Sequence, residues 1–120
     1  MYKQINAYRA DKVPPLTLDA QLTQQTRLHS QLMASNQIPF NEEGIIKTSN
    51  TVANLIPYCG LSTAIGVNQG YVNPAQANVD KWLNSDRTIV SIEGQYELTG
   101  VGIAKNAAGR YYFTQIFLCR

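Results

Sequence analysis

The sequence predicts an α+β fold in which helices cover a central sheet, as a three-layer α-β-α sandwich. Three observations carry this prediction. Apolar residues recur at helical spacing before residue 36 and again after residue 73. The end of the chain alternates instead as two β runs that are joined by a short turn. The final run is largely apolar on both faces, which is typical of a central strand with helices over at least one face.

Bulk composition indicates one folded domain over residues 1–120. Hydrophobic residues make up 44% of the chain and charged residues only 15%, so disorder is not expected. The net charge is +2 and the basic residues are scattered singly, which excludes the clustered basic face of a nucleic-acid-binding protein. No apolar run is long enough to span a bilayer.

The first two helices are predicted on either side of a proline break. Residues 2–10 read as a short helix, and Pro14-Pro15 cannot continue it because proline lacks the backbone donor. Thr17 stands where an N-cap is expected, and a long helix should follow to about Asn36. Its predicted apolar face holds Leu18, Leu22, Leu28, Leu32 and Met33.

His29 lies in the middle of that apolar face and is the only histidine of the chain. We expect a buried imidazole with a structural hydrogen bond. A metal-binding or catalytic role would need partners that no second histidine can supply.

The segment 37–72 is rich in glycine and proline, and it predicts loops with one or two short strands or helical turns. Glu42 and Glu43 are expected in a solvated loop; the alternative is a site for a hard cation. Asn73-Pro74 is a strong helix start, with Asn as the cap and Pro at the first helical position. This helix should run to about Ser85, and its buried stripe is Ala75, Val79, Trp82 and Leu83.

The remaining elements are a β-hairpin and a pair of cysteines. Residues 97–106 and 110–119 are the two β runs, and Ala107-Ala108-Gly109 forms the turn. Cys59 and Cys119 are too far apart in sequence for a redox or zinc motif. They are either two buried thiols or one disulfide that closes a loop of about sixty residues.

Short motifs occur in a recognisable order along almost the whole chain. They are N-x-x-R at 6–9, P-L at 15–16, H-S-x-x-M-A at 29–34, W-x-x-S at 82–85, G-V-G at 100–102 and Y-F-T-Q-I-F at 112–117. In this order they resemble the short bacterial form of the CAP superfamily (cysteine-rich secretory proteins, antigen 5 and pathogenesis-related proteins). The resemblance implies a CAP-like α-β-α sandwich and export from the cytoplasm. Export favours the Cys59–Cys119 disulfide.

The resemblance also implies a cleft in which two histidines and two glutamates bind a divalent cation such as zinc in many members. Carried over by position, the first histidine falls at Phe40 or Asn41 and the first glutamate at Ala53. The second glutamate falls at Ser85, and Arg87 stands closest to the second histidine. None of these side chains is a good zinc ligand, so we expect neither a metal nor another cofactor.

Arg87 is the most distinctive of these residues because a guanidinium is permanently cationic. Two structural roles suit it: an ion pair with Asp86 or Glu93, or a cap on carbonyls at the end of the Trp82 helix. The functional alternative is a bidentate contact to an anionic ligand. Further possible ligand contacts are Asn54, Tyr58 and Asp86.

The favoured function is an exported, non-enzymatic binding or interaction domain that lacks the family's metal-binding residues. One alternative is a hydrolase or protease that acts through the cleft. Another is a domain that binds a small apolar ligand, such as a sterol or lipid, between the loops of residues 37–72. The partner would be a protein or small molecule, not a nucleic acid, and the protein is expected to be a monomer or a weak dimer.

Overall fold

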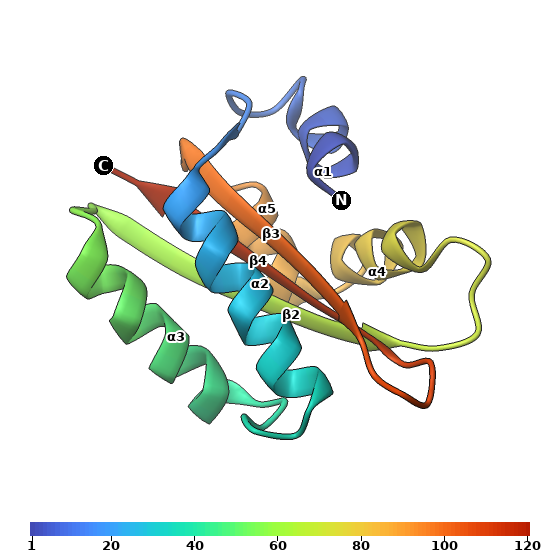
Figure 1. Cartoon of the computed structure of the whole chain (residues 1–120). Helices are drawn as coiled ribbons and strands as arrows, with labels where there is room; N and C mark the ends of the chain where they lie inside the picture. The colour runs from blue at the N-terminus through green and yellow to red at the C-terminus, as the bar shows by residue number, and fades with distance from the viewer.

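A computed structural model describes all 120 residues and shows the predicted α+β sandwich (Figure 1). The sheet has four strands in the order β1-β3-β4-β2. Helices α2 and α3 cover one face, and α1, α4 and α5 cover the other. None of the helices combines the length and apolarity that crossing a membrane requires. The helices are α1 (Tyr2–Arg9), α2 (Ala20–Ala34), α3 (Glu42–Leu55), α4 (Pro74–Leu83) and α5 (Asp86–Ile92), and the strands are β1 (Thr17–Leu18), β2 (Gly60–Asn68), β3 (Leu98–Lys105) and β4 (Tyr111–Cys119).

Strand β4 is the central strand, as its apolar faces predict. It pairs antiparallel with β3 on one side and with β2 on the other. Phe113 and Phe117 enter the core beneath α1, α4 and α5, whereas Ile116 and Leu118 enter the core beneath α2 and α3. The β3–β4 hairpin is confirmed, and Gly109 provides the positive φ (85°) of its turn.

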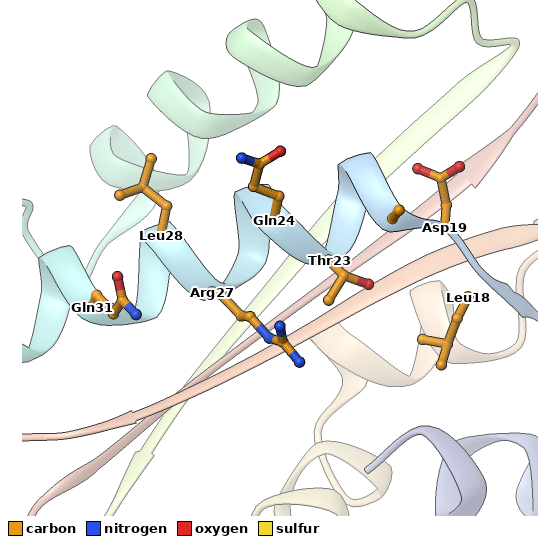
Figure 2. Close-up of a pocket in the computed structure, with 8 residues that line it drawn as sticks. Leu18, Asp19, Thr23, Gln24, Arg27, Leu28 and Gln31 are labelled. Atoms are coloured by element: carbon orange, nitrogen blue, oxygen red, sulfur yellow. The ribbon is translucent and has the colours of Figure 1, made fainter.

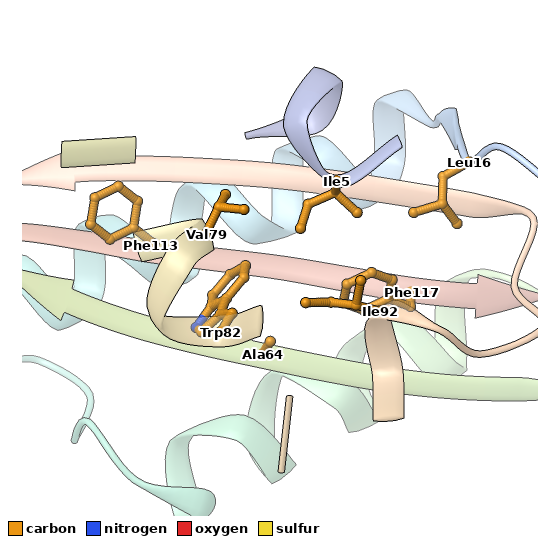
Figure 3. Packing of buried hydrophobic residues seen from close by; sticks show 8 residues of the cluster. All are labelled: Ile5, Leu16, Ala64, Val79, Trp82, Ile92, Phe113 and Phe117. Carbon is orange, nitrogen blue, oxygen red and sulfur yellow. The ribbon is translucent and has the colours of Figure 1, made fainter. Parts of the chain in front are cut away.

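The core beneath α1, α4 and α5 is the largest single cluster and is built around Trp82 (Figure 3). The indole of Trp82 packs beside Ala64 of β2, and its Nε1 donates a hydrogen bond to the carbonyl of Ile65 (3.1 Å). This contact ties α4 to an edge strand of the sheet. The eight buried members of this core are Ile5, Leu16, Ala64, Val79, Trp82, Ile92, Phe113 and Phe117.

The predicted apolar face of α2 is partly wrong. Leu18 and Leu28 are 49% and 46% exposed, whereas Thr26 and Ser30 are fully buried. The cause is the glycine pair of β3, since a Cβ at Gly102 would collide with the backbone of Thr26. The helix therefore lies so close to the sheet that small hydroxyl residues face it. Ser30 satisfies its hydroxyl with Thr114 Oγ1 (2.7 Å) and with the carbonyl of Gly102 (3.0 Å).

Thr17 is not the N-cap of α2. It belongs to β1, which pairs in parallel with the start of β3 at Leu98. The cap is Asp19, whose carboxylate accepts a hydrogen bond from the Leu22 N–H (2.9 Å). A short edge pairing thus displaces the helix start by two residues, because the backbone groups of Thr17 are used by the sheet.

The loops predicted for residues 37–72 are also a wrong prediction, because this segment forms a helix of 14 residues and a strand of nine. Asn41 caps α3 by accepting a hydrogen bond from the Gly44 N–H (3.2 Å). The buried side of α3 is formed by Gly44, Thr48 and Val52, so it carries almost no apolar signal. Glu42 and Glu43 occupy the first turn of this helix, where carboxylates are favoured by the helix dipole.

The start of α4 is confirmed, since the Asn73 side chain accepts a hydrogen bond from the Gln76 N–H (3.1 Å). The helix ends at Leu83, and α5 follows after a break of two residues. This second helix was not predicted. It places Arg87 beside β2 in the first turn of α5, instead of at the end of α4.

Cys59 and Cys119 form the predicted disulfide, with a sequence separation of 60 residues. The bond joins the residue before β2 to the end of β4, and the Cys59 N–H also donates to the carbonyl of Cys119 (2.8 Å). The disulfide therefore locks one end of the sheet.

Removal of this disulfide should destabilise the protein without changing its fold. We expect the Cys59→Ser/Cys119→Ser variant to lose about 3 kcal/mol of unfolding free energy, because its unfolded chain regains the entropy of a long loop. Urea denaturation of the variant and the oxidised wild type measures the difference. A loss below about 1 kcal/mol would show that this cross-link does not limit the unfolded chain.

Candidate functional site

A cleft of about 510 Å³ runs along β2, between the first turns of α3 and the helix α5. We call it the β2 cleft. Its floor is formed by four consecutive residues of an edge strand, so the cleft lies at the side of the sheet and not over one face. The lining residues are Phe40, Asn41, Glu42, Ile45, Ser62, Thr63, Ala64, Ile65, Arg87, Thr88 and Ser91.

The two walls of the β2 cleft are fixed to its floor by hydroxyl pairs. Ser62 Oγ lies 2.6 Å from Ser91 Oγ, which ties β2 to α5. Thr63 Oγ1 lies 3.0 Å from Ser49 Oγ, which ties the next residue of β2 to α3 on the opposite wall. Neighbouring residues of a strand point to opposite faces, so these two contacts hold the helices on either side of the strand edge.

An ion pair between Arg87 and Glu42 crosses the mouth of the cleft. Arg87 belongs to α5 and Glu42 to α3, so the pair joins the two walls. Both side chains remain well exposed, at 74% for Arg87 and 65% for Glu42. Such an exposed pair contributes only about 0–1 kcal/mol, so an incoming anion can displace Glu42 at low cost.

Neither structural role predicted for Arg87 is found. Its partner is Glu42, not Asp86 or Glu93, and it lies in the first turn of α5 instead of at the end of α4. The carbonyl of Trp82 at the end of α4 is satisfied by the Thr88 hydroxyl (2.6 Å). A cation in the first turn of a helix is disfavoured by the helix dipole. Helix stability therefore does not explain why an arginine occupies this position.

The structure brings only part of the predicted site together. Phe40, Asn41 and Arg87 line the β2 cleft, with Asn41 serving as the N-cap of α3. The residues that do not line it are Ala53, Asn54, Tyr58, Ser85 and Asp86. Ala53 and Asn54 lie in the last turn of α3, because that helix continues to Leu55.

The residues that face the cleft from the sheet are Ser62 to Ile65, which the sequence motifs did not indicate. The motif order assigned the Ala53-Asn54-Leu55 segment to the cleft, but the strand that forms the floor starts at Gly60. The alternation of Leu61, Thr63, Ile65 and Val67 was the available signal for this strand. It was hidden because the intervening positions are glycine, serine and alanine.

The side chains of the β2 cleft do not fit the zinc ion that the resemblance implies. Zinc requires histidine, cysteine or carboxylate ligands at close range. The lining residues contain neither histidine nor cysteine, and their single carboxylate, Glu42, is engaged by Arg87. No group of three or more such side chains is gathered anywhere in the structure.

His29 is buried between α2 and α3, away from the lining of the β2 cleft. Its Nδ1 lies 2.5 Å from Thr48 Oγ1, and this contact is the structural hydrogen bond expected from the sequence. Its Nε2 has no protein partner. Neither ring nitrogen contacts a carboxylate, so the Thr48 hydroxyl and His29 lack the acid that would complete a catalytic triad.

Burial lowers the pKa of His29 below its usual value, and this should make the protein less stable in mild acid. The unfolded chain takes up a proton near pH 6.5, whereas the folded chain keeps a neutral imidazole to lower pH. Stability should be fully present above about pH 6.5 and should fall as the pH decreases below it, by at most about 1.4 kcal/mol per pH unit for this one group.

The pH dependence is measured by urea denaturation between pH 5 and pH 8, with His29→Gln as the comparison. This variant should be about 1–3 kcal/mol less stable at pH 8 and should show a flatter profile in acid. Equal slopes in the two proteins would show that His29 does not determine the acid response.

A second hollow of about 670 Å³ follows the outer side of α2 (Figure 2). Its side chains splay to both sides of the helix: Gln24 and Leu28 point one way and Arg27 the other. They do not converge on one point: six of the eight residues belong to α2, and the other two, Leu18 and Asp19, directly precede it. This groove is larger than the β2 cleft, but it lacks opposing walls and is a poorer candidate site.

Comparisons with known proteins agree with the fold. The model of the cysteine-rich secretory protein family, CAP, matches residues 2–117. A comparison with curated protein sequences gave no match.

The chain is similar to an outer surface protein from Borrelia burgdorferi, with a TM-score of 0.73 and 16% identity over 99% of this chain and 89% of that one. It is also similar to an extracellular protein containing an SCP domain from Bacillus anthracis str. Ames (TM-score 0.69, 18% identity), covering 99% of this chain but only 39% of that protein. The chain belongs to the cysteine-rich secretory protein (CAP) family.

Proposed function

We propose that this protein is an exported, non-enzymatic binding domain whose β2 cleft takes an anionic ligand through Arg87. The observation that carries the proposal is the cationic side chain at the mouth of a cleft whose floor and α5 wall bear hydroxyl groups. Export is supported by the two structural relatives, which are described as an outer surface protein and an extracellular protein. The disulfide is consistent with an oxidising compartment.

A carboxylate is the anion that the cleft suits best. Glu42 already presents one carboxylate to Arg87, so the arrangement shows the contact that a ligand would replace. A guanidinium offers two parallel N–H donors that match the two oxygens of a carboxylate. The Thr88 hydroxyl already donates to the carbonyl of Trp82, but one hydroxyl of the Ser62–Ser91 pair keeps a proton that it can donate to the ligand.

The pair with Glu42 would also tune the affinity. Glu42 competes with the ligand for the same guanidinium, so it lowers the affinity by the free energy of an exposed ion pair. In the absence of ligand it keeps the arginine folded across the mouth. After displacement, Glu42 remains in the first turn of α3, where the helix dipole still favours its charge.

A thermal-shift screen with acetate, succinate, citrate, phosphate and sulfate tests the proposal. A carboxylate at about ten times its dissociation constant should stabilise the protein by about 1.4 kcal/mol, or about 6 °C. The Arg87→Lys variant should bind about ten-fold more weakly, because lysine keeps the charge but loses the paired donors. The Glu42→Gln variant should bind about two- to five-fold more tightly, because the competing ion pair is gone.

Arg27→Lys is the matched control, because Arg27 is an exposed arginine of the other groove. Its response to each anion should equal that of the wild type. The proposal is overturned if no anion shifts either the wild type or Glu42→Gln, or if Arg87→Lys responds like the wild type.

A further inference from the structure

The outer edge of β2, at the floor of the cleft, has backbone groups without partners. The carbonyl of Ile65 accepts a hydrogen bond from Trp82 Nε1, so it points away from β4. The N–H and C=O of one residue in an antiparallel strand point to the same side, and the side alternates along the strand. Leu61 and Thr63 must therefore also direct their backbone groups outward, and Thr63 does so at the floor of the cleft.

The pairing of the other strands gives the same result. The Asn106 N–H donates to the carbonyl of Arg110 at the β3–β4 turn (2.9 Å), so even-numbered residues of β4 bond to β3. Odd-numbered residues of β4 then bond to β2, and the register pairs Gln115 with Ala64. Ala64 is bonded within the sheet, which leaves Thr63 facing outward. Neither the N–H nor the C=O of Thr63 bonds to a loop or a side chain.

The open edge ends at Ile65. The outward carbonyl of this residue is occupied by Trp82, so only its N–H remains for a ligand. The edge therefore offers a donor and an acceptor at Leu61 and Thr63 but a donor alone at Ile65. A continuing peptide would leave its own N–H unpaired opposite the occupied carbonyl, whereas a terminal carboxylate needs only donors.

Arg87 lies at the same end of the cleft. Ser91 of α5 contacts Ser62, while Thr88 bonds to the carbonyl of Trp82, the residue that reaches Ile65. Helix α5 therefore begins near Ile65 and runs back along the strand. The first turn of α5 carries Arg87, and its ion pair with α3 crosses the path that a chain pairing with β2 would follow.

We propose that the ligand of the β2 cleft is the C-terminal segment of a peptide, which adds to the open edge of β2 as a parallel strand and places its terminal carboxylate against Arg87 and the Ile65 N–H. This inference rests on the proposed function. Backbone pairing with Leu61 and Thr63 supplies affinity for any extended sequence, and the carboxylate fixes the end of the peptide. The floor of four residues, Ser62 to Ile65, spans about 13 Å and matches a segment of about four residues.

The walls fit this occupant. Side chains of an added strand would point alternately toward α3 and α5, as those of β2 do. They would meet Ile45 and Phe40 on the α3 wall and the hydroxyl groups of Thr88 and Ser91 on the α5 wall. Peptides with an apolar residue on the first side and a small or polar residue on the second should therefore bind best.

The test uses N-acetylated peptides of one to four residues, drawn from a randomised pool with free C-terminal carboxylates, and the same pool with amidated C-termini. Affinity is measured by isothermal titration, and the backbone amides of the wild-type protein are followed by NMR. The expected result is an affinity that rises at least about ten-fold from one residue to four. Hydrogen exchange of the amides of Thr63 and Ile65 should slow with the four-residue acids, and amidation should weaken binding at least about ten-fold.

Proline variants at the two sheet edges provide the matched comparison. Thr63→Pro removes an outward N–H from β2, and Ile103→Pro removes one from the outer edge of β3, beyond the reach of β1. Thr63→Pro should reduce the affinity for four-residue acids to that for one-residue acids. Ile103→Pro should leave the affinity for four-residue acids unchanged. If Thr63→Pro does not fold, the exchange measurement on the wild type decides.

The outcomes separate the two proposals. If acetate and succinate bind through Arg87 but affinity does not rise with peptide length, or the Thr63 amide is not protected, the peptide inference is wrong and the anion-binding proposal stands. If neither the small carboxylates nor the peptide acids bind, both are wrong. Equal affinity for peptides with free and with amidated C-termini would show that β2 binds an added strand without using its terminal carboxylate. That result would overturn the inference as stated.

Discussion

Replacing Arg9 by methionine is expected to lower the free energy of unfolding by about 4–5 kcal/mol. Arg9 is fully buried, yet no carboxylate neutralises it. Its Nη1 donates to the carbonyls of Ile92 (2.8 Å) and Gly94 (2.9 Å), and its Nη2 donates to those of Pro14 (2.6 Å) and Tyr96 (3.1 Å). One guanidinium thus fixes the loop after α1 and the loop between α5 and β3.

The size of this loss in unfolding free energy follows from the carbonyl groups that Arg9→Met leaves unpaired. Methionine fills a similar volume but leaves the carbonyls of Ile92, Pro14 and Tyr96 without a donor. The Gly94 carbonyl keeps the Tyr96 N–H (2.9 Å). Each unpaired group costs about 1–3 kcal/mol unless water reaches it. Arg9→Lys should be nearly as damaging, because an ammonium has three donors on a compact centre and cannot span four carbonyls. Urea denaturation measures both, with Arg27→Met on the exposed side of α2 as the control. A cost for Arg9→Met below about 1 kcal/mol would show that water replaces the guanidinium.

Gly102→Val should cost about 4 kcal/mol or more. A Cβ at this position would overlap the backbone of Thr26 and Arg27, and a helix backbone cannot rotate out of the way as a flexible side chain can. The substitution must push α2 off β3, which would break the contacts of Ser30 with Gly102 and Thr114.

Gly70→Ala is the control for this substitution. Gly70 has a positive φ of 87° but open space around it, so an added methyl group should cost only about 1 kcal/mol of backbone strain. Thermal and urea unfolding of the two variants would distinguish the energetic cost of steric overlap at Gly102 from the cost of backbone strain at Gly70. Similar losses in both would contradict the close approach of α2 to β3.

The parts of the fold that the sequence predicted are those whose signals are local. The hairpin follows from alternation in β3 and β4 and from the glycine turn, and α4 follows from Asn73-Pro74 and the stripe that includes Trp82. The motif order also predicted the sandwich and favoured the disulfide between Cys59 and Cys119. Each of these patterns is complete within a short stretch of chain or rests on an ordered set of motifs.

Elements whose buried faces are small or polar were missed. Helix α3 buries Gly44 and Thr48, and β2 places Gly66 where an added Cβ would overlap the Asn78 side chain. Close packing between layers removes large apolar residues from these positions, and with them the periodic signal. The apolar face of α2 was misjudged for the same reason, since Thr26 and Ser30 replace leucines against the glycines of β3.

The candidate site was predictable only in part because it depends on contacts between distant segments. The motifs pointed to Arg87 and to the start of α3, but spacing cannot reveal that Glu42 pairs with Arg87 across the mouth of the cleft. The open edge of β2 follows from strand order and from the Trp82 contact with Ile65, neither of which is a property of the local sequence. The tertiary structure, which places Arg87, Glu42 and the open edge of β2 together, therefore decides what the cleft can bind.

The most direct test of the central claim is a calorimetric titration of one protein preparation with zinc and, separately, with succinate. Succinate should bind saturably at one site, about ten-fold more weakly in Arg87→Lys, and zinc should show no saturable binding. One-site zinc binding that disappears in Glu42→Gln, together with no response to succinate, would contradict the anion-binding proposal, because the β2 cleft would then be a metal site and not an anion site.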